Sequence, residues 1–390
     1  MAAFQEIFFK ALQQSIKKHQ LLPIIETLIE VLAQNDIIVH RVQLPMNEYF
    51  GFRHPQYRAL ITTWEEGTLD EAYIPHSVED AMAQFQRVME NSPYKAVMLE
   101  GEDFFHWRLV DSNPFQILDG LKRSGYTDYF NFGIPLPQGQ TQICSLATKL
   151  PEGFPDRLET LILDLRYLVS FTIYGYYQSF VSHSIAQTYL GSNTGTNVLA
   201  GKMFRGKQDT LEAGILFCDI RGFTQMSEQL GGEKIISVVN SVFQIVGDEI
   251  EVFGGEILKF IGDALLIIFP QKSERSKEEL CKQMITVAKN ARDRVQKLAE
   301  ELSLPVGIGF GGHFGTVQYG NIGTQNRLDF TVMGPAVNLT SRLESMCKSL
   351  DAYLTLSSFI SAGLESELDF LGEHSLKGVE GMISIWGLRN

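Results

Sequence analysis

Cysteine is scarce in this sequence, and the spacing of the few cysteines excludes two classes of protein. Only four occur among 390 residues, namely Cys144, Cys218, Cys281 and Cys347. None belongs to a Cys-x-x-Cys pair or stands near a histidine at the spacing of a zinc site. The chain is therefore neither a disulfide-stapled miniprotein nor a zinc-finger protein, and we expect reduced, mostly packed thiols.

Positive charge is also in deficit. Lysine and arginine together number 33 against 46 aspartates and glutamates, which gives a formal net charge of −13. Binding to DNA or to an anionic membrane surface depends on cations that displace counterions, so this balance opposes both. We expect no nucleic-acid partner. A small phosphorylated ligand is still compatible, because metal ions and a few local cations can offset its charge.

Long hydrophobic runs are missing as well. The most apolar segment, residues 167–180, contains Ser, Thr, Gly and Gln and is shorter than the roughly 18 residues that a membrane helix needs. The first residues show no charged segment followed by an apolar stretch and a cleavage site, so they do not form a secretory signal. We expect a cytoplasmic protein without a membrane segment.

The chain has the length of about two domains, and its glycine distribution changes near residue 190. Upstream, helical periodicity over 1–35 is followed by β-rich runs and shorter helical segments, which is typical of an α+β domain. The β-rich runs include 37–44, 57–65, 105–110 and 142–149, and the helical segments are 79–90 and 114–125. A long helix over 154–191 carries an apolar stripe, which predicts a partner surface, most simply a second copy of the chain.

Downstream of residue 211 the pattern predicts a second α+β domain. The expected elements are strands at 213–220, 256–261, 264–269 and 306–323, with helices from 223 onward and over 275–301. This β-α-β-β-α-β order is a split βαβ arrangement, which packs two helices on one antiparallel sheet in the ferredoxin-like manner. A further helix over 335–350 begins with Pro335, where the missing N–H costs nothing.

Two aspartates in this domain are placed to hold metal ions. Asp219 ends an apolar strand just before a helix, and Asp263 lies in a tight turn between two strands that would neighbour the first. If the hairpin pairs in this way, both carboxylates meet at one end of the sheet, where Mg²⁺ or Mn²⁺ could be held against a polyphosphate. The backbone N–H groups of 220–224, including Phe223 and Thr224, can face that phosphate. Alternatively, Asp219 caps the helix and Asp263 is a turn residue.

Asn338 and Arg342 form a second candidate pair. They stand four residues apart on the expected helix and therefore project from one face. An amide and a guanidinium there could bind a phosphoryl group as it gains charge, although a solvated helix face would look the same. Lys259 and Lys377 are either ligand contacts or surface lysines. His313, among glycines, is interpreted as structural.

Five segments in this order resemble the catalytic domain of class III nucleotidyl cyclases. They are FCDIRGFT, GGEILKFIGDALLIIF, GIGFGGHFGTVQYGNIG, DFTVMGPAVNLTSRLE and LKG, spread over about 211–388. The resemblance implies that Asp219, Asp263 and the carbonyl of Ile220 hold two divalent ions, Mg²⁺ or Mn²⁺. It also implies that Asn338 positions the ribose and that Arg342 and Lys377 contact the phosphates. An additional phosphate-binding arginine of the family has no clear counterpart, although Arg327 is near its place.

The resemblance also implies the substrate and the assembly. Lys259 and Thr331 occupy the two positions that contact the purine edge in the family. At these positions, members that use ATP carry Lys with Asp or Thr, whereas guanylate cyclases carry Glu with Cys. A lysine donates to N1 of adenine but opposes the N1–H of guanine. The chain is thus expected to be an adenylate cyclase that forms 3′,5′-cyclic AMP. In the family each site is shared across a head-to-tail dimer, and this chain has both halves, which implies a homodimer.

The N-terminal part resembles GAF-like sensor domains attached to bacterial adenylate cyclases. The resemblance rests on GYTDYFNFGIPLPQGQTQICSLATKLPEGFPDRLETL and on the connecting QTYLGSNTGTNVLAGKMFRG. The expected organisation is a GAF-like regulatory domain at 1–160, a helical transducer and linker at 161–207, and the cyclase domain at 208–390. The sequence does not decide whether the first domain binds a small molecule or no ligand at all. Its histidines His40, His54, His76 and His106 are isolated from one another and form no ligand-binding pattern.

Three rival functions are considered. A guanylate cyclase would use GTP in place of ATP, and a catalytically silent nucleotide-binding regulator would have no need of the intact acidic and basic sets. A diguanylate cyclase shares the hairpin and the core, but FIGDAL at 260–265 replaces its glycine-glycine-acid signature.

Overall fold

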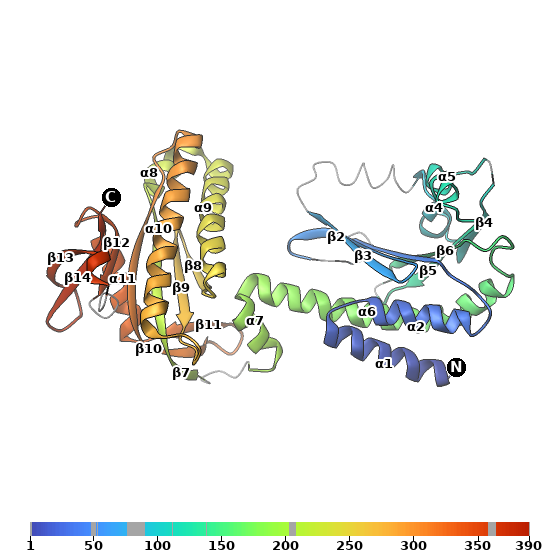
Figure 1. The fold of residues 1–390 in the computed structure, drawn as a ribbon, viewed down its shortest axis with the longest axis horizontal. Coiled ribbons are helices and arrows are strands. Elements are labelled where there is room, and N and C mark those ends of the chain that lie inside the picture. Colours follow the sequence, from blue (N-terminus) through green and yellow to red (C-terminus); the bar gives the residue numbers. More distant parts are fainter. Residues whose placement is uncertain are drawn as a thin grey trace. The chain divides into compact units, whose positions relative to one another are not determined.

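The chain consists of two compact units, Met1–Ile185 and Ala186–Asn390. The structure is a computed structural model (Figure 1). It describes residues 2–47, 52, 54–75, 90–110, 112–137, 139–202, 208–357 and 364–389. Within these ranges no helix is both long enough and apolar enough to cross a membrane. All four cysteines are free and buried, as their spacing predicts.

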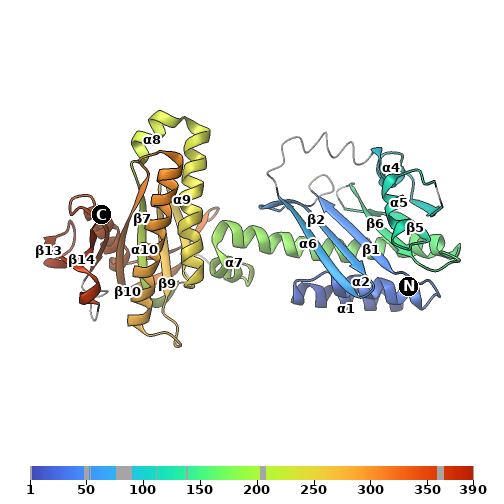
Figure 2. The same cartoon turned by 45° about the horizontal axis from the view of Figure 1, so that its top comes forward.

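The first unit is built on a six-stranded antiparallel sheet in the order β3-β2-β1-β6-β5-β4. The strands are β1 (Arg41–Asn47), β2 (Tyr57–Glu65), β3 (Thr68–Pro75), β4 (Phe104–Arg108), β5 (Asp128–Pro135) and β6 (Thr141–Thr148). The helices are α1 (Ala2–Lys18), α2 (Leu22–Ala33), α4 (Tyr94–Met98), α5 (Gln116–Arg123) and α6 (Arg157–Leu190). Helices α1, α2 and α6 lie together on one face of the sheet (Figures 1 and 2).

The apolar stripe of α6 is largely covered by its own unit, which corrects one expectation. Leu158, Ile162 and Val169 are buried in a core that also contains residues of α2 and of the sheet. A second copy of the chain is therefore not needed to cover this stripe. Two aromatic residues of α6 remain outward, since Tyr167 and Phe171 are each 64% exposed.

Two strands of the first unit lie outside the β-rich runs named from the sequence. Strand β3 is an edge strand whose residues are mostly exposed, so it lacks an apolar run. Strand β5 is almost wholly buried but contains Asn131 and Gly133, which are more typical of turns. The helical segment expected over 79–90 lies outside the described residues except for Glu90, as does His76.

The second unit confirms the split βαβ order. Its sheet runs β13-β14-β12-β10-β7-β9-β8, with β11 paired to β10. The strands are β7 (Gln208–Arg221), β8 (Glu256–Ile261), β9 (Ala264–Pro270), β10 (Gly307–Gly323), β11 (Leu328–Met333), β12 (Ala352–Ser357), β13 (Asp369–Ser375) and β14 (Met382–Arg389). The helices are α7 (Ser192–Leu199), α8 (Phe223–Leu230), α9 (Gly232–Val252), α10 (Lys277–Leu302) and α11 (Pro335–Met346).

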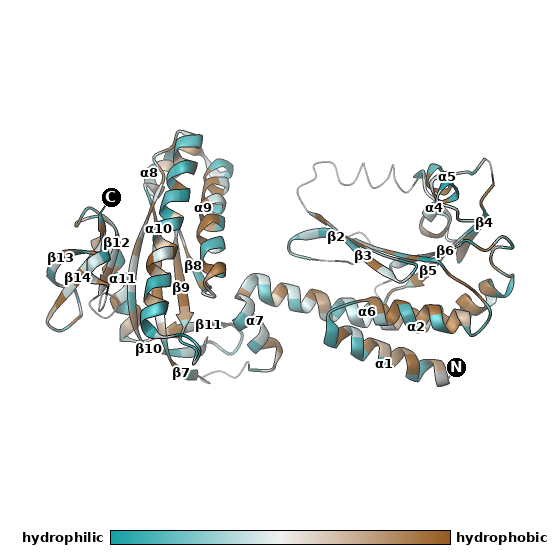
Figure 3. Cartoon of the chain, in the orientation of Figure 1, coloured by the Kyte–Doolittle hydropathy of each residue, from teal (hydrophilic) through white to brown (hydrophobic). Residues whose placement is uncertain are grey.

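The two faces of this sheet are covered differently. Alternate residues of β7, such as Leu216, Cys218 and Ile220, pack with α9 and α10 in the main core. Because side chains alternate across a strand, Asp219 and Arg221 belong to the opposite face, against which α11 lies. Figure 3 shows strand β9 as almost entirely hydrophobic and α9 and α10 as polar on their outer sides.

Close contact between β10 and α11 depends on Gly311. A Cβ atom at this position would lie 2.1 Å from the backbone nitrogen of Glu344, and backbone cannot rotate away. We expect Gly311→Ala to destabilise the protein by about 1–3 kcal/mol, the usual cost of overpacking. Urea unfolding measures this, with Gly232→Ala as the control because nothing lies within 4 Å of a Cβ there. Equal midpoints for the two variants would contradict the close packing.

The structural interpretation of His313 is supported. The ring is buried, and its Nδ1 lies 2.7 Å from the hydroxyl of Ser357. Burial lowers the pKa of His313 to about 4, so the imidazole is neutral at pH 7.

Candidate active site

The structure brings Asp219 and Asp263 together at one end of the sheet. Asp219 pairs in register with Ala264, the residue that follows Asp263 in the β8–β9 turn. The N–H of Ile220 donates to the carbonyl oxygen of Asp263 at 3.2 Å, which ties the turn to β7. Gly262 has φ of 65°, so this tight turn needs the residue that accepts left-handed geometry at no steric cost. The convergence predicted from the hairpin is therefore present.

The two carboxylates are close enough to repel each other. The pKa of Asp219 is raised, first by burial and then by the negative charge of Asp263, while Arg221 opposes the shift. Two neighbouring carboxylates that are partly removed from water are unfavourable as they stand. A cation bound between them would remove that penalty.

A third carboxylate and a guanidinium adjoin this pair. Glu344 on α11 accepts a hydrogen bond at 3.0 Å from Arg221, and its side chain is only 13% exposed. Burial raises the pKa of Glu344 to about 7, and Asp219 and Asp263 add to the shift while Arg221 opposes it. Arg221 reaches Glu344 across Gly309, where a Cβ atom would lie 2.0 Å from the guanidinium.

Sequence reasoning missed both members of this ion pair. Arg221 stands two residues after Asp219, so strand alternation alone places it on the same face, and that signal was available. No comparable signal pointed to Glu344. It stands two residues beyond Arg342 on α11, and only the packing of α11 on β10 brings it to Arg221.

The N-terminus of α8 lies directly after Asp219 and offers backbone N–H groups. Gly222 is the N-cap, with φ of 78°, and it has no side chain to accept from the first turn. Phe223 and Thr224 begin the helix. Phe223 packs partly against the core, whereas Thr224 is exposed. Uncapped N–H groups at a helix start are suited to bind an anion such as a phosphate group.

Asn338 and Arg342 are exposed on one side of α11, as their spacing predicts. The buried residues of this helix are Ala336, Thr340 and Leu343. At 100° per residue, Glu344 projects about 200° away from Arg342. Since Glu344 points to Arg221 beside the acidic pair, Asn338 and Arg342 of the same chain are directed away from it.

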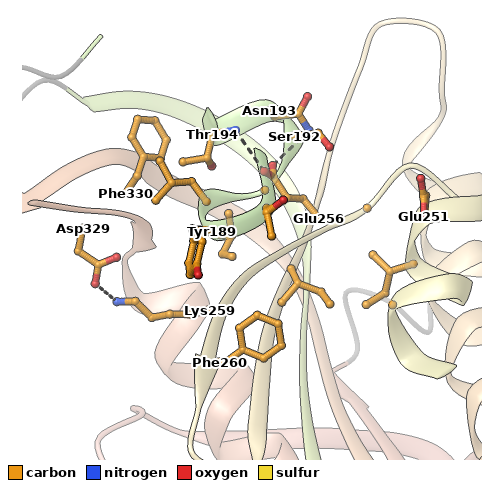
Figure 4. Close-up of a pocket in the computed structure, with 18 of the residues that line it drawn as sticks. Tyr189, Ser192, Asn193, Thr194, Glu251, Glu256, Lys259, Phe260, Asp329 and Phe330 are labelled. Atoms are coloured by element: carbon orange, nitrogen blue, oxygen red, sulfur yellow. Dashed lines mark hydrogen bonds and ion pairs between the residues drawn. The ribbon is translucent and has the colours of Figure 1, made fainter. Parts of the chain in front are cut away.

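Lys259 lies in a pocket between the end of α6, α7, β8 and β11. The pocket holds about 630 Å³, and its lining includes Tyr189, Glu256, Lys259 and Asp329. Figure 4 shows the Lys259 ammonium directed at the carboxylate of Asp329, with which it forms an ion pair. Thr331, two residues beyond Asp329 on β11, is 4% exposed.

Glu256 occupies another side of this pocket and holds the start of α7. Its carboxylate accepts hydrogen bonds from the N–H of Thr194 and the side-chain amide of Asn193, both at 3.1 Å (Figure 4). The hydroxyl of Thr194 also lies 3.0 Å from that of Tyr319. The beginning of α7 is thus tied to the sheet of the second unit, on the strand that carries Lys259.

The other basic candidates lie in exposed loops. Lys377 begins the turn between β13 and β14 and is exposed, as predicted. Arg327 lies in the exposed turn between β10 and β11 and contributes to the lining of the Lys259 pocket. Neither side chain is brought to Asp219 by an observed contact.

The residues at the acidic pair fit a divalent cation that shares its ligands with a substrate. No group of three or more His, Cys, Asp or Glu residues within the described ranges is arranged to hold a metal ion by itself. Mg²⁺, however, is usually held by one or two carboxylates together with substrate phosphates and water. Asp219 and Asp263 supply the carboxylates, and the start of α8 supplies a place for the phosphates.

Comparison with known proteins shows what the second unit is similar to. Residues 206–389 match the model of the adenylate and guanylate cyclase catalytic domain. An adenylate cyclase of Anabaena cylindrica is 31% identical over 183 residues, which are 47% of this chain and 36% of that protein. Adenylate cyclase 1 of Rhizobium meliloti is 29% identical over 184 residues, 45% of this chain and 27% of that protein. The chain thus matches about a third of the length of these relatives.

Among solved structures, the adenylyl cyclase CyaB from P. aeruginosa is 24% identical to this chain, with a TM-score of 0.43. The aligned part covers 47% of this chain and 96% of the CyaB chain. The family match and the relatives support the resemblance of residues 206–389 to a cyclase catalytic domain.

Proposed function

We propose that this protein is an adenylate cyclase that converts ATP to 3′,5′-cyclic AMP and pyrophosphate. The observation that carries the proposal is the meeting of Asp219 and Asp263 beside the uncapped start of α8, within a cyclase catalytic domain. Adenylate cyclases among the sequence relatives support ATP as the substrate. A lysine at position 259, which can donate to N1 of adenine, supports it further.

In the proposed reaction the 3′-hydroxyl of ATP attacks the α-phosphorus and displaces pyrophosphate, and the hydroxyl proton passes to water. Two divalent ions at Asp219, Asp263 and the Ile220 carbonyl would activate the attacking oxygen and offset the charge of the phosphates. The N–H groups of Phe223 and Thr224 bind the phosphate oxygens and orient them. No side chain of the protein acts as a nucleophile.

The remaining contacts come from basic and amide side chains. Asn338 positions the ribose, so that the 3′-oxygen stays aligned with the α-phosphorus. Arg342 donates to the phosphoryl oxygens as they gain charge, and Lys377 contacts the departing pyrophosphate. Arg221 forms an ion pair with Glu344 and so keeps a positive charge near the acidic pair. No substrate contact is proposed for Arg221.

The active form is proposed to be a homodimer with two shared sites. Asn338 and Arg342 are exposed on the side of α11 away from Asp219, so a complete site needs these residues from a second copy. Apolar side chains near the acidic turn and on β11 are exposed and could be covered by that copy. They include Phe260 at 61%, Ile261 at 46% and Met333 at 40%.

The first unit is proposed to be a GAF-like sensor that regulates the cyclase domain. Its mixed α+β fold is compatible with this role, and α6 leads from it to α7. Glu256 fastens the start of α7 to β8, the strand of Lys259, which provides a route from the linker to the substrate pocket. The chemical signal is not specified by these contacts.

The test is an assay of the purified full chain with ATP and, separately, GTP in the presence of Mn²⁺. We expect cyclic AMP from ATP and at least about tenfold less product from GTP, because Lys259 opposes the N1–H of guanine. Lys259→Glu combined with Thr331→Cys should shift the preference toward GTP. An unchanged preference would remove Lys259 from base recognition, and preferred use of GTP by the unaltered chain would identify a guanylate cyclase instead.

A further inference from the structure

Both ring nitrogens of His106 face a carboxylate within the first unit. Its Nε2 lies 3.1 Å from Oδ2 of Asp128, and its Nδ1 lies 3.2 Å from Oε1 of Glu159. His106 is on β4, Asp128 begins β5, and Glu159 is in the first turn of α6. This one side chain therefore joins two strands of the sheet to the start of the long helix.

The geometry of these contacts requires a charged imidazole. An ionised carboxylate only accepts hydrogen bonds, and a neutral imidazole has one N–H to donate, whereas an imidazolium has two. Both contacts can therefore be hydrogen bonds to ionised carboxylates only when His106 is protonated. The pKa of His106 is raised, first by its hydrogen bond with Asp128 and further by Glu159, while burial opposes the shift.

Asp128 is the fixed end of this cluster. Its side chain is fully buried and accepts hydrogen bonds from the backbone N–H groups of Tyr129 and Phe154, at 2.9 and 2.8 Å. A guanidinium nitrogen of Arg108 lies 3.9 Å from its Oδ2, so β4 contributes a positive charge while β5 and α6 contribute negative ones. Because a buried carboxylate that loses donors is costly, Asp128 keeps a hydrogen bond from the ring in either protonation state of the histidine.

Glu159 is the end of the cluster that is able to separate. Its side chain is 40% exposed, so water can replace the ring as its partner. Once the proton has left, the remaining N–H of His106 donates to Asp128, and the lone pair of Nδ1 faces a carboxylate oxygen of Glu159. Two acceptors repel each other, so this contact opens. The rings of Phe130 and Phe154 also pack around the imidazole, with centroids 5.5 and 6.4 Å from its own.

We propose that the first unit responds to pH through a clasp, in which charged His106 fastens Glu159 at the start of α6 to Asp128 in the sheet. The folded-state pKa of His106 lies above the unfolded value of about 6.5. The stability that the clasp contributes is therefore fully present below that pH and is lost as the pH rises through the folded-state pKa. Because α6 leads on to α7, loosening its start would reach the cyclase domain, and this last step alone rests on the proposed function.

The charge of His106 is tested by NMR titration of the full chain, labelled with ¹³C in histidine, from pH 5.5 to 9. The signal of His106 is identified by its loss in His106→Gln or His106→Asn. We expect a midpoint above about 6.5 in the unaltered chain and a lower one in Glu159→Gln, which removes one of the two anions. Asp164→Asn, at an exposed carboxylate of the same helix, should leave the midpoint unchanged. Equal midpoints in the three proteins, or a midpoint at or below about 6.5 in the unaltered chain, would overturn the proposal.

Loosening of α6 is tested by amide hydrogen exchange of residues 157–166, measured by mass spectrometry. Glu159→Gln and the unaltered chain are compared at the same pH, so that the intrinsic pH dependence of exchange cancels. We expect the variant to exchange about threefold faster at pH 6 and at the same rate at pH 8.5, where the clasp is open in both proteins. The effect is modest because Glu159 is partly exposed. A ratio of rates that does not change with pH would reject the clasp.

The step from the clasp to the cyclase domain has its own measurement. Cyclic AMP formation by Glu159→Gln is divided by that of the unaltered chain at each pH from 6 to 8.5, which cancels the pH dependence of the chemistry itself. We expect this ratio to change at least about twofold over the range, and the same ratio for Asp164→Asn to stay constant. A constant ratio for Glu159→Gln would reject the regulatory step. If no protein forms cyclic nucleotide, the proposed function is wrong, and the titration and exchange measurements still decide the clasp.

Discussion

Replacing Asp219 or Asp263 by asparagine is expected to abolish formation of cyclic AMP, by about a thousandfold or more. Asparagine keeps the size of the side chain but removes the negative charge that a divalent cation requires. The pKa of Asp219 is already raised by burial and by Asp263, so loss of one charge relieves repulsion in the absence of metal. The folded protein should therefore be at least as stable as the unaltered chain, as measured by thermal unfolding without added cation.

The same strand provides a control for this prediction. Asp209 lies on β7 near its other end, about 30 Å from Asp219 at the usual rise per residue, and it is exposed. Asp209→Asn should keep full activity. Steady-state assays over a range of Mn²⁺ concentrations provide the measurement. Appreciable activity in Asp219→Asn or Asp263→Asn, at any Mn²⁺ concentration, would show that the acidic pair does not hold the metal ions.

Mixing two inactive variants is expected to restore activity if each site is shared between two chains. Asp219→Asn destroys the acidic half of a site, and Arg342→Ala destroys the other half. In a heterodimer of the two, one site combines both defects while the second combines the intact acidic pair of one chain with the intact Arg342 of the other. Random pairing makes half of the dimers mixed, each with one competent site of two, so recovery should reach about a quarter of the original activity.

A second mixture serves as the control for complementation. Asp219→Asn combined with Asp263→Asn damages the same half of the site in both chains, so no pairing creates a complete site. Co-expression avoids any limit from slow exchange of subunits, and cyclic AMP formation is measured on the purified mixture. Recovery in the control, or no recovery with Arg342→Ala, would contradict a site assembled from Asp219 of one chain and Arg342 of the next.

The architecture of the second unit was accessible from local patterns. Continuous apolar runs mark β7 and β9, a 3.6-residue period marks α9 and α10, and glycines end or turn these elements. The order of the elements then limits the sheet to few topologies. The meeting of Asp219 and Asp263 follows from this order, because one aspartate ends the central strand and the other occupies the turn beside it.

The first unit was harder to read, since its strands do not follow the simple patterns. Strand β3 is polar at the edge of the sheet, and β5 is buried despite its asparagine and glycine. The apolar stripe of α6 was correctly located, but its partner was not. Periodicity shows that a helix face must be covered, but it does not show which part of the protein covers it. The cover is provided by the same unit.

The sequence by itself determined the candidate site residues and the elements on which they lie. Asn338 and Arg342 share an exposed helix face because helical geometry fixes their angle, whatever the rest of the chain does. The tertiary structure alone decided that Glu344 meets Arg221 and that Asp329 meets Lys259. Each of these four side chains looks like a solvated charge when taken singly, and only the packing of distant strands and helices brings opposite charges within contact.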